Sequence, residues 1–237
     1  MCTVTWRREA EAYEVFFNRD EQRTRATARP PAVLGTQNNP YLAALDGQAG
    51  GTWLAVTARG LTLGLLNFYD GQAAPPPPNP LSRGHLVLEL IDLADARAVA
   101  QGLAVMDLAR YPAFLLLALD PQRGFLMHWD GRTARAGELT GAHRPLSTSS
   151  FETDEVLRER RMTYERMIGS GEPSPGQLDR FHHERNPRGD AYSVWMARPD
   201  AWTVSFSRVR VDPDRVHFAY EARDSAHPVV VTGPRRA

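Results

Sequence analysis

Cys2 is the residue of this sequence best suited to nucleophilic chemistry, and it is the only cysteine among 237 residues. A small residue at position 2 favours removal of Met1, which would place an α-amine and a thiol on one residue. An α-amine has a pKa of ~7.7–8.0 and a thiol ~8.5, so near neutral pH the amine can act as base for the thiol beside it. The alternative is that Cys2 is a small residue buried in a strand.

A run of four polar residues, Asn18, Arg19, Asp20 and Glu21, follows Phe16-Phe17. If this strand pairs with the one that holds Cys2, an arginine there would stabilise a thiolate and a carboxylate would orient the amine. Alternation puts Asn18 and Asp20 on one face and Arg19 and Glu21 on the other. Either pair can face Cys2, but all four cannot unless the strand ends or bulges. The alternative is a solvated strand end.

Three further groups are candidates for chemistry. Asn67 ends an apolar strand; an amide aimed at a developing alkoxide contributes ~3–4 kcal/mol to transition-state stabilisation, although asparagine also forms strand-end turns. Trp53 follows Gly50-Gly51-Thr52 and is either the floor of an acyl pocket or a core residue. The run His182-His183-Glu184 has no second ligand pair at metal spacing, so we interpret it as a surface run and predict no metal site.

The elements that position these residues are read from hydrophobic periodicity. Strands are predicted in hairpins at 2–8 with 12–18, 53–58 with 61–68, and 113–119 with 124–129, and in a closing meander at 191–198, 201–211, 215–222 and 228–232. Helices are predicted at 93–109, capped by Asp92, and at 154–168, capped by Thr153. Residues 71–84 are expected to form a stiff proline loop, and 169–190 a further loop. This order favours an α+β fold with antiparallel sheets and helices packed outside them.

Composition narrows the class of protein. Basic and acidic residues balance at 28 each, so no bulk positive field favours nucleic acid. Every basic residue is arginine, which excludes a Schiff-base or P-loop lysine. A length of 237 residues fits one large domain or two small ones, and we expect a single domain over 1–237. No apolar run reaches the length of a secretory or membrane-spanning segment, so we expect no membrane span and a cytoplasmic location. No sequence feature indicates an oligomeric state.

Four segments resemble the NRDE protein family, also called the TANGO2 family. They are MCTV at the start, FFNRDEQRTRA at 16–26, GGTWLAVTARG at 50–60 and SRG at 82–84. That family is similar in turn to the N-terminal nucleophile (Ntn) hydrolases of the bile salt hydrolase and penicillin V acylase branch. The resemblance implies a four-layer αββα sandwich and a terminal cysteine that attacks an amide carbonyl.

The resemblance also implies roles for individual residues. Cys2, Arg19, Asp20 and Asn67 match the catalytic positions, and Asn18 and Trp53 are expected to bind substrate. The sequence departs from the hydrolase pattern at three places. Arg19 and Asp20 are adjacent rather than three positions apart. The segment 146–150 (LSTSS) carries serine and threonine where those enzymes have asparagine. Those enzymes also have an arginine late in the chain, for which only Arg198 or Arg208 are candidates here.

Two functions follow from this. The first is an N-terminal cysteine amidohydrolase that cleaves an amide bond of a small acylated metabolite and needs no cofactor. The second is a binding or trafficking protein of the NRDE/TANGO2 type that carries haem or an acyl-lipid or acyl-CoA ligand and does no chemistry.

Overall fold

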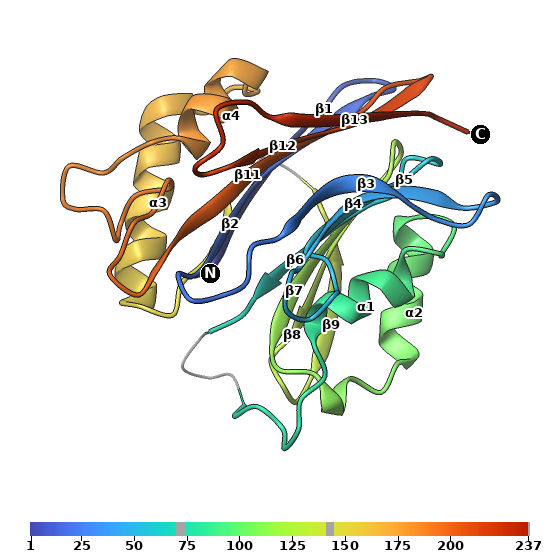
Figure 1. The fold of residues 1–237 in the computed structure, drawn as a ribbon, viewed down its shortest axis with the longest axis horizontal. Coiled ribbons are helices and arrows are strands. Elements are labelled where there is room, and N and C mark those ends of the chain that lie inside the picture. Colours follow the sequence, from blue (N-terminus) through green and yellow to red (C-terminus); the bar gives the residue numbers. More distant parts are fainter. Residues whose placement is uncertain (70–73, 141–144, 237) are drawn as a thin grey trace.

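Two antiparallel sheets stack face to face, and helices cover the outer face of each (Figure 1). The computed structural model describes residues 1–69, 74–140 and 145–236. The layers therefore run helix, sheet, sheet, helix, which confirms the predicted α+β class and the four-layer αββα sandwich.

The first sheet carries both ends of the chain. Its six strands lie in the order β10 (Leu146–Thr148), β1 (Cys2–Arg8), β2 (Tyr13–Gln22), β11 (Ala201–Val211), β12 (Arg215–Ala222) and β13 (Val229–Pro234). The pairing of β1 with β2 confirms the first predicted hairpin, although β2 extends four residues beyond the expected end at 18.

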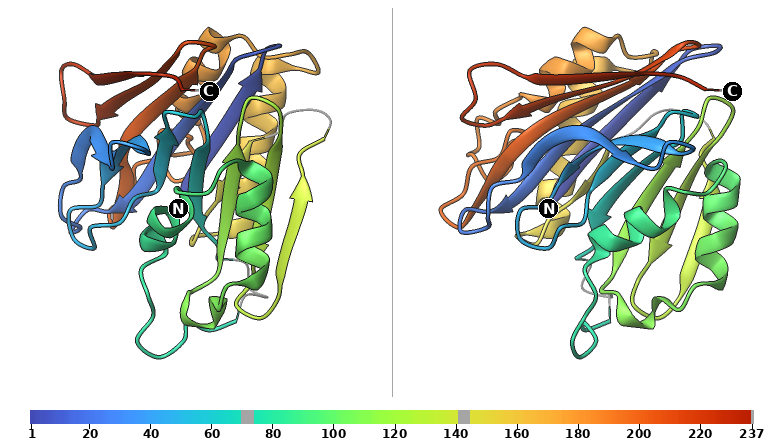
Figure 2. Two further views of the ribbon diagram at one scale, coloured as in Figure 1. Left: turned by 90° about the vertical axis from the view of Figure 1, so that its right-hand side faces the viewer. Right: turned by 45° about the vertical axis from the view of Figure 1, so that its right-hand side comes forward.

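The second sheet is a seven-stranded meander in chain order (Figure 2). Its strands are β3 (Arg29–Gly35), β4 (Pro40–Leu45), β5 (Leu54–Thr57), β6 (Thr62–Asn67), β7 (Phe114–Leu119), β8 (Gly124–Trp129) and β9 (Ala134–Glu138). The hairpins β5–β6 and β7–β8 confirm two further predictions. Four strands, β3, β4, β9 and β10, were not predicted.

Helices α1 (Arg83–Leu90) and α2 (Ala96–Val105) pack on the second sheet, and α3 (Thr153–Ile168) and α4 (Pro175–His182) pack on the first (Figures 1 and 2). Three apolar clusters fill the spaces between the layers. Phe17 and Leu54 lie at the sheet–sheet interface, where full burial of one such side chain stabilises the fold by about 1.5–3 kcal/mol.

Strict alternation along β2 divides its side chains between two layers. Tyr13, Val15 and Phe17 face the second sheet, whereas Phe16 faces α4. Continued through the polar run, the same alternation sends Arg19 toward the second sheet and Asp20 toward α3.

The predicted helix at 93–109 is wrong in extent. Helix α2 begins after Asp95, whose carboxylate accepts the N–H of Ala98 at 2.7 Å, and a separate 3₁₀ turn, Leu108–Arg110, begins after Asp107. Helix α3 matches its prediction, but Thr153 is its first residue rather than its cap. A helix also begins at Arg83, within the predicted proline loop; residues 71–73 of that loop lie outside the described residues.

The segment 169–198 differs most from expectation. Helix α4 occupies part of the predicted loop, and the predicted strand at 191–198 is reduced to one bridge between Ala197 and Trp202. The interpretation of His182-His183-Glu184 as a surface run is also wrong, because His182 ends α4 and is fully buried.

Candidate active site

Cys2, Arg19, Asp20, Trp53 and Asn67 line one cleft of about 420 Å³ between the hairpins β1–β2 and β5–β6. Five of the six predicted site residues are therefore brought together. The described part of this lining also includes the apolar residues Leu65 and Leu81 and the charged residues Arg25, Asp46 and Arg83.

Cys2 is held by strands on both sides. It pairs with Arg19 of β2 and with Thr148 of β10, and its N–H donates to the Thr148 hydroxyl at 3.1 Å. Its side chain packs with Val4 and Trp6 in the sheet–sheet interface and is 6% exposed. Burial raises the pKa of the Cys2 thiol, an effect that the neighbouring ammonium group and Arg19 only partly offset.

Arg19 shares the Cys2 face, as direct pairing across the hairpin requires. Its guanidinium carbon lies 4.2 Å from the centroid of the Trp53 ring, and its Nη2 contacts a carboxylate oxygen of Asp46 at 2.5 Å. Trp53 therefore belongs both to the core and to the lining of the cleft.

Asp46 anchors the charged wall of the cleft. Its carboxylate also accepts two hydrogen bonds from Arg25, at 2.8 and 3.0 Å, and the N–H groups of Gln48 and Ala49. Burial opposes ionisation, but the hydrogen bonds from Arg25 and Ala49 and the charge of Arg19 lower the pKa of Asp46 to about 2. The group is therefore a fixed anion at neutral pH.

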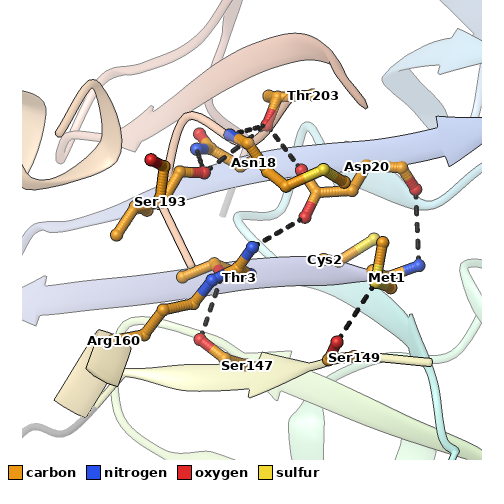
Figure 3. A network of polar contacts seen from close by, with 12 residues as sticks. Met1, Cys2, Thr3, Asn18, Asp20, Ser147, Ser149, Arg160, Ser193 and Thr203 are labelled. Carbon is orange, nitrogen blue, oxygen red and sulfur yellow. Dashed lines mark hydrogen bonds and ion pairs between the residues drawn. The ribbon is translucent and has the colours of Figure 1, made fainter. Parts of the chain in front are cut away.

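Asp20 turns its carboxylate away from the Cys2 face, toward α3 (Figure 3). One oxygen accepts the hydroxyl of Thr203 at 2.6 Å, and the other pairs with Arg160 at 3.3 Å. Its backbone instead holds the chain start: the Met1 amine donates to the Asp20 carbonyl at 3.4 Å, and the Asp20 N–H donates to the Met1 carbonyl at 3.1 Å.

Asn18 lies on the same face as Asp20 and does not line the cleft. Its amide donates to the carbonyls of His182 and Val194, and its oxygen lies 3.0 Å from His182 Nδ1. His182 Nε2 also hydrogen-bonds to the Thr5 hydroxyl at 2.8 Å, and burial lowers the pKa of His182 well below its usual range. Asn18 therefore cannot contact a ligand in the cleft, as its expected substrate-binding role requires. Its hydrogen bonds instead join β2 to α4. The alternative of a solvated strand end is also wrong.

Asn67 ends β6 at the mouth of the cleft and donates one amide N–H to the Tyr69 hydroxyl at 3.0 Å. An amide NH₂ carries two hydrogens, and Tyr69 is the only acceptor for them within the described residues, so the second hydrogen can be donated to a ligand. The neighbouring wall depends on glycine: a Cβ on Gly51 would lie 2.5 Å from the backbone carbon of Gly84. Two backbones can thus approach closely enough for the Thr52 N–H to donate to the Gly84 carbonyl at 3.1 Å.

Three further residues of the site, Asp46, Arg160 and Thr148, were not predicted from the sequence. No local signal identifies Asp46 or Arg160, because both act through partners distant in the chain. Thr148 lies in the segment recognised as departing from the hydrolase pattern. Of the two candidates for a late arginine, Arg198 lies beside Met1, whereas Arg208 pairs with Glu14 elsewhere on β2.

The αββα sandwich is the fold of the Ntn hydrolases. An N-acylethanolamine-hydrolyzing acid amidase ortholog from Caenorhabditis elegans has a TM-score of 0.58 and 9% identity, over 88% of this chain and 92% of that chain. A mutant conjugated bile acid hydrolase from Clostridium perfringens has a TM-score of 0.54 and 12% identity, over 100% and 97%. At these identities the likeness establishes the fold.

The family model described as "Transport and Golgi organisation 2" (TANGO2) matches residues 1–169, and the chain belongs to that family. A comparison with curated proteins gives no significant match. Within 1–69, 74–140 and 145–236, no helix is long and apolar enough to span a bilayer, and no three His, Cys, Asp or Glu residues are placed to hold a metal ion.

Proposed function

We propose that this protein is an N-terminal cysteine amidohydrolase whose nucleophile is Cys2 after removal of Met1. The observation that supports this most directly is the shared cleft of Cys2, Arg19 and Asn67. The hydrogen bond from the Cys2 nitrogen to the Thr148 hydroxyl adds to it, because the same hydroxyl would orient the α-amine of the mature chain.

The α-amine takes the proton of the Cys2 thiol, and the thiolate attacks the carbonyl carbon of the amide. The second amide N–H of Asn67 donates to the oxygen on which negative charge develops. When the intermediate collapses, the C–N bond breaks and the ammonium group returns its proton to the departing nitrogen. Water, deprotonated by the same amine, attacks the thioester; the acid leaves and the sulfur recovers its proton.

The substrate class follows from the lining of the cleft. Trp53, Leu65 and Leu81 offer apolar surface to an acyl group, and Arg19 and Arg83 offer hydrogen-bond donors at its edge. A volume of about 420 Å³ suits a small acylated metabolite. We propose a cytoplasmic location for this activity.

The test is hydrolysis of a panel of acylated amides and lactams by protein whose terminus has been confirmed by intact mass. We expect Cys2→Ala to abolish turnover and Asn67→Leu to lower kcat by ~10²–10³. The matched control is Asn38→Leu at an exposed turn between β3 and β4, which should leave kcat unchanged. Turnover that persists in Cys2→Ala, or retention of Met1 in the purified native protein, would refute the proposal.

The second candidate is a ligand-binding protein without chemistry, and the serine and threonine of 146–150 favour it. Haem fits the cleft poorly, because burial raises the pKa of the Cys2 thiol and the described lining contains no histidine. A haem titration with a Soret shift that depends on Cys2→Ser would support the haem version. An acyl ligand bound without turnover would support the acyl-lipid or acyl-CoA version.

A further inference from the structure

The side chain of Met1 fills a buried slot at the start of β1. It is 7% exposed and packs on Met196 and Ala201, with Tyr69 against the cluster. Its sulfur lies 3.4 Å from Nη1 of Arg198 and 3.3 Å from the hydroxyl of Ser149; Figure 3 shows the Ser149 contact. The Met1 slot therefore has apolar walls and a polar end.

The walls of the Met1 slot are held by contacts that do not involve Met1. The Thr203 N–H donates to the Met196 carbonyl and the Met196 N–H to the Thr203 hydroxyl, both at 2.9 Å, and the Arg198 N–H donates to the Ala201 carbonyl at 2.7 Å. Cys2 is fixed independently by its pairing with β2 and β10. A site supported in this way relaxes only partially when a side chain is removed, so excision of Met1 opens the slot.

The chemistry of the proposed reaction places the amine half of the substrate at the Met1 slot. The departing nitrogen must receive its proton from the Cys2 α-amine, so it lies beside the Cys2 nitrogen. Met1 is attached to that same nitrogen. A substituent beyond the departing nitrogen therefore extends toward the space that Met1 occupies, past Tyr69, which contacts both the Met1 cluster and the cleft.

The polar end of the Met1 slot sets a preference among such substituents. Nε and Nη2 of Arg198 bind the two carboxylate oxygens of Asp200, and Nη1 donates to the Met1 sulfur. A thioether is a weak acceptor. Once Met1 is removed, no described residue accepts a hydrogen bond from Nη1, and an oxygen acceptor on the ligand would be a stronger partner than the sulfur.

We infer that the Met1 slot is the subsite for the amine half of the substrate, an inference that rests on the proposed function. It takes an unbranched substituent of about four heavy atoms, the length of a methionine side chain, with an apolar start and an oxygen acceptor near its end. Retained Met1 blocks this subsite as well as withholding the base.

The test compares alkylation of Cys2 by chloroacetamide, N-butylchloroacetamide and N-(2-methoxyethyl)chloroacetamide. In each case the thiolate displaces chloride and forms a C–S bond, and the thiol proton passes to the α-amine. The 2-methoxyethyl group copies the methionine side chain with oxygen in place of sulfur. Rates are divided by those for the free peptide Cys-Thr-Val, which removes intrinsic differences between the probes.

For the chain that begins at Cys2, we expect the normalised rate with the methoxyethyl probe to exceed that with chloroacetamide by about tenfold or more, equivalent to ~1.4 kcal/mol. Ala201→Met, which refills the slot, should abolish this ratio. Arg198→Met should equalise the methoxyethyl and butyl probes. The matched control is Ala104→Met on the exposed surface of α2, which should retain the ratio.

Two kinds of failure are distinguishable. If chloroacetamide labels Cys2 no faster than it labels the free peptide, the proposed function fails and the subsite assignment falls with it. If labelling is fast but the probe ratio is the same in wild type and Ala201→Met, the proposed function stands and the subsite assignment is wrong.

Discussion

Replacing Asp46 with asparagine tests whether the charged wall of the cleft is held by an ionised carboxylate. The side chain would keep an oxygen for the Gln48 and Ala49 N–H groups but would lose the charge that binds Arg19 and Arg25. A carboxyl group whose pKa falls from 3.8 to about 2 on folding stabilises the native state by about 2 kcal/mol at neutral pH. We expect Asp46→Asn to lower the free energy of unfolding by about that amount at pH 7.

The sign of the pH dependence follows from the lowered pKa. Above the unfolded-state pKa both states are ionised and the full stabilisation is present. As the pH falls from 3.8 toward about 2, the unfolded state takes up a proton that the native state excludes, and the stabilisation disappears. The difference between wild type and Asp46→Asn should therefore shrink to about 1 kcal/mol by pH 3.

The assay is urea unfolding of both proteins at pH 7, 5, 4 and 3, followed by tryptophan fluorescence. Asp130→Asn is the matched control, because Asp130 also accepts two backbone N–H groups in its turn but is only partly buried and forms no ion pair with an arginine of the described residues. A difference between wild type and Asp46→Asn that stays constant from pH 7 to pH 3 would show that the titration of Asp46 contributes nothing to stability.

Three further substitutions test the surrounding structure, each by urea unfolding. Gly51→Ala puts a Cβ 2.5 Å from the backbone of Gly84, and we expect a loss of about 1–3 kcal/mol. Arg160→Met leaves the buried Asp20 carboxylate without its guanidinium and should cost about 3–5 kcal/mol, most of it restored by adding Asp20→Asn. Burial lowers the pKa of His182, so below pH 6.5 this histidine takes up a proton in the unfolded state but not in the native state. The free energy of unfolding of the wild type should therefore fall by up to about 1.4 kcal/mol per pH unit below pH 6.5, and His182→Gln should lack this slope.

A specific result would contradict each of these three predictions. A stable Gly51→Ala protein would mean that the two backbones can separate without cost. An Asp20→Asn change that fails to rescue Arg160→Met would mean that Arg160 acts through Thr3 rather than Asp20. Equal pH slopes for wild type and His182→Gln would mean that His182 is protonated in the native protein.

The hairpins were predictable because their information is local. Apolar alternation and turn residues lie within a few positions of each other in β1–β2, β5–β6 and β7–β8. The missed strand β3 contains Pro30 and Pro31, which argue against a strand; it tolerates them as an edge strand with a register irregularity between Arg29 and Ala32. Helix α4 had a local signal that was overlooked, the capping box of Ser174 and Gln177 with proline at the first position.

Only those features of the site that follow from the alternation of side chains along one strand were predictable from the sequence. The sequence required Arg19 and Asp20 to face opposite ways, but the choice of which one faces the second sheet depends on where the layers pack. That choice is made by burial of Phe17 in the sheet–sheet interface, which commits Arg19 to the same side. Asp46 and Arg160 lie 27 and 140 residues from the side chains that they bind, beyond any local pattern.

Retention of Met1 and reactivity of Cys2 oppose each other in this structure. Burial is the largest cause of the raised thiol pKa, and Met1, itself buried and paired with Asp20, directly precedes Cys2. Excision of Met1 would therefore have three effects on the site around Cys2. It supplies the α-amine as base, opens the slot toward Arg198, and admits water to the thiol, which lowers its pKa. The pH profile for alkylation of Cys2 should accordingly shift to lower pH in the chain that begins at Cys2. An identical profile in the Met1-containing chain would show that burial by Met1 does not control the thiol.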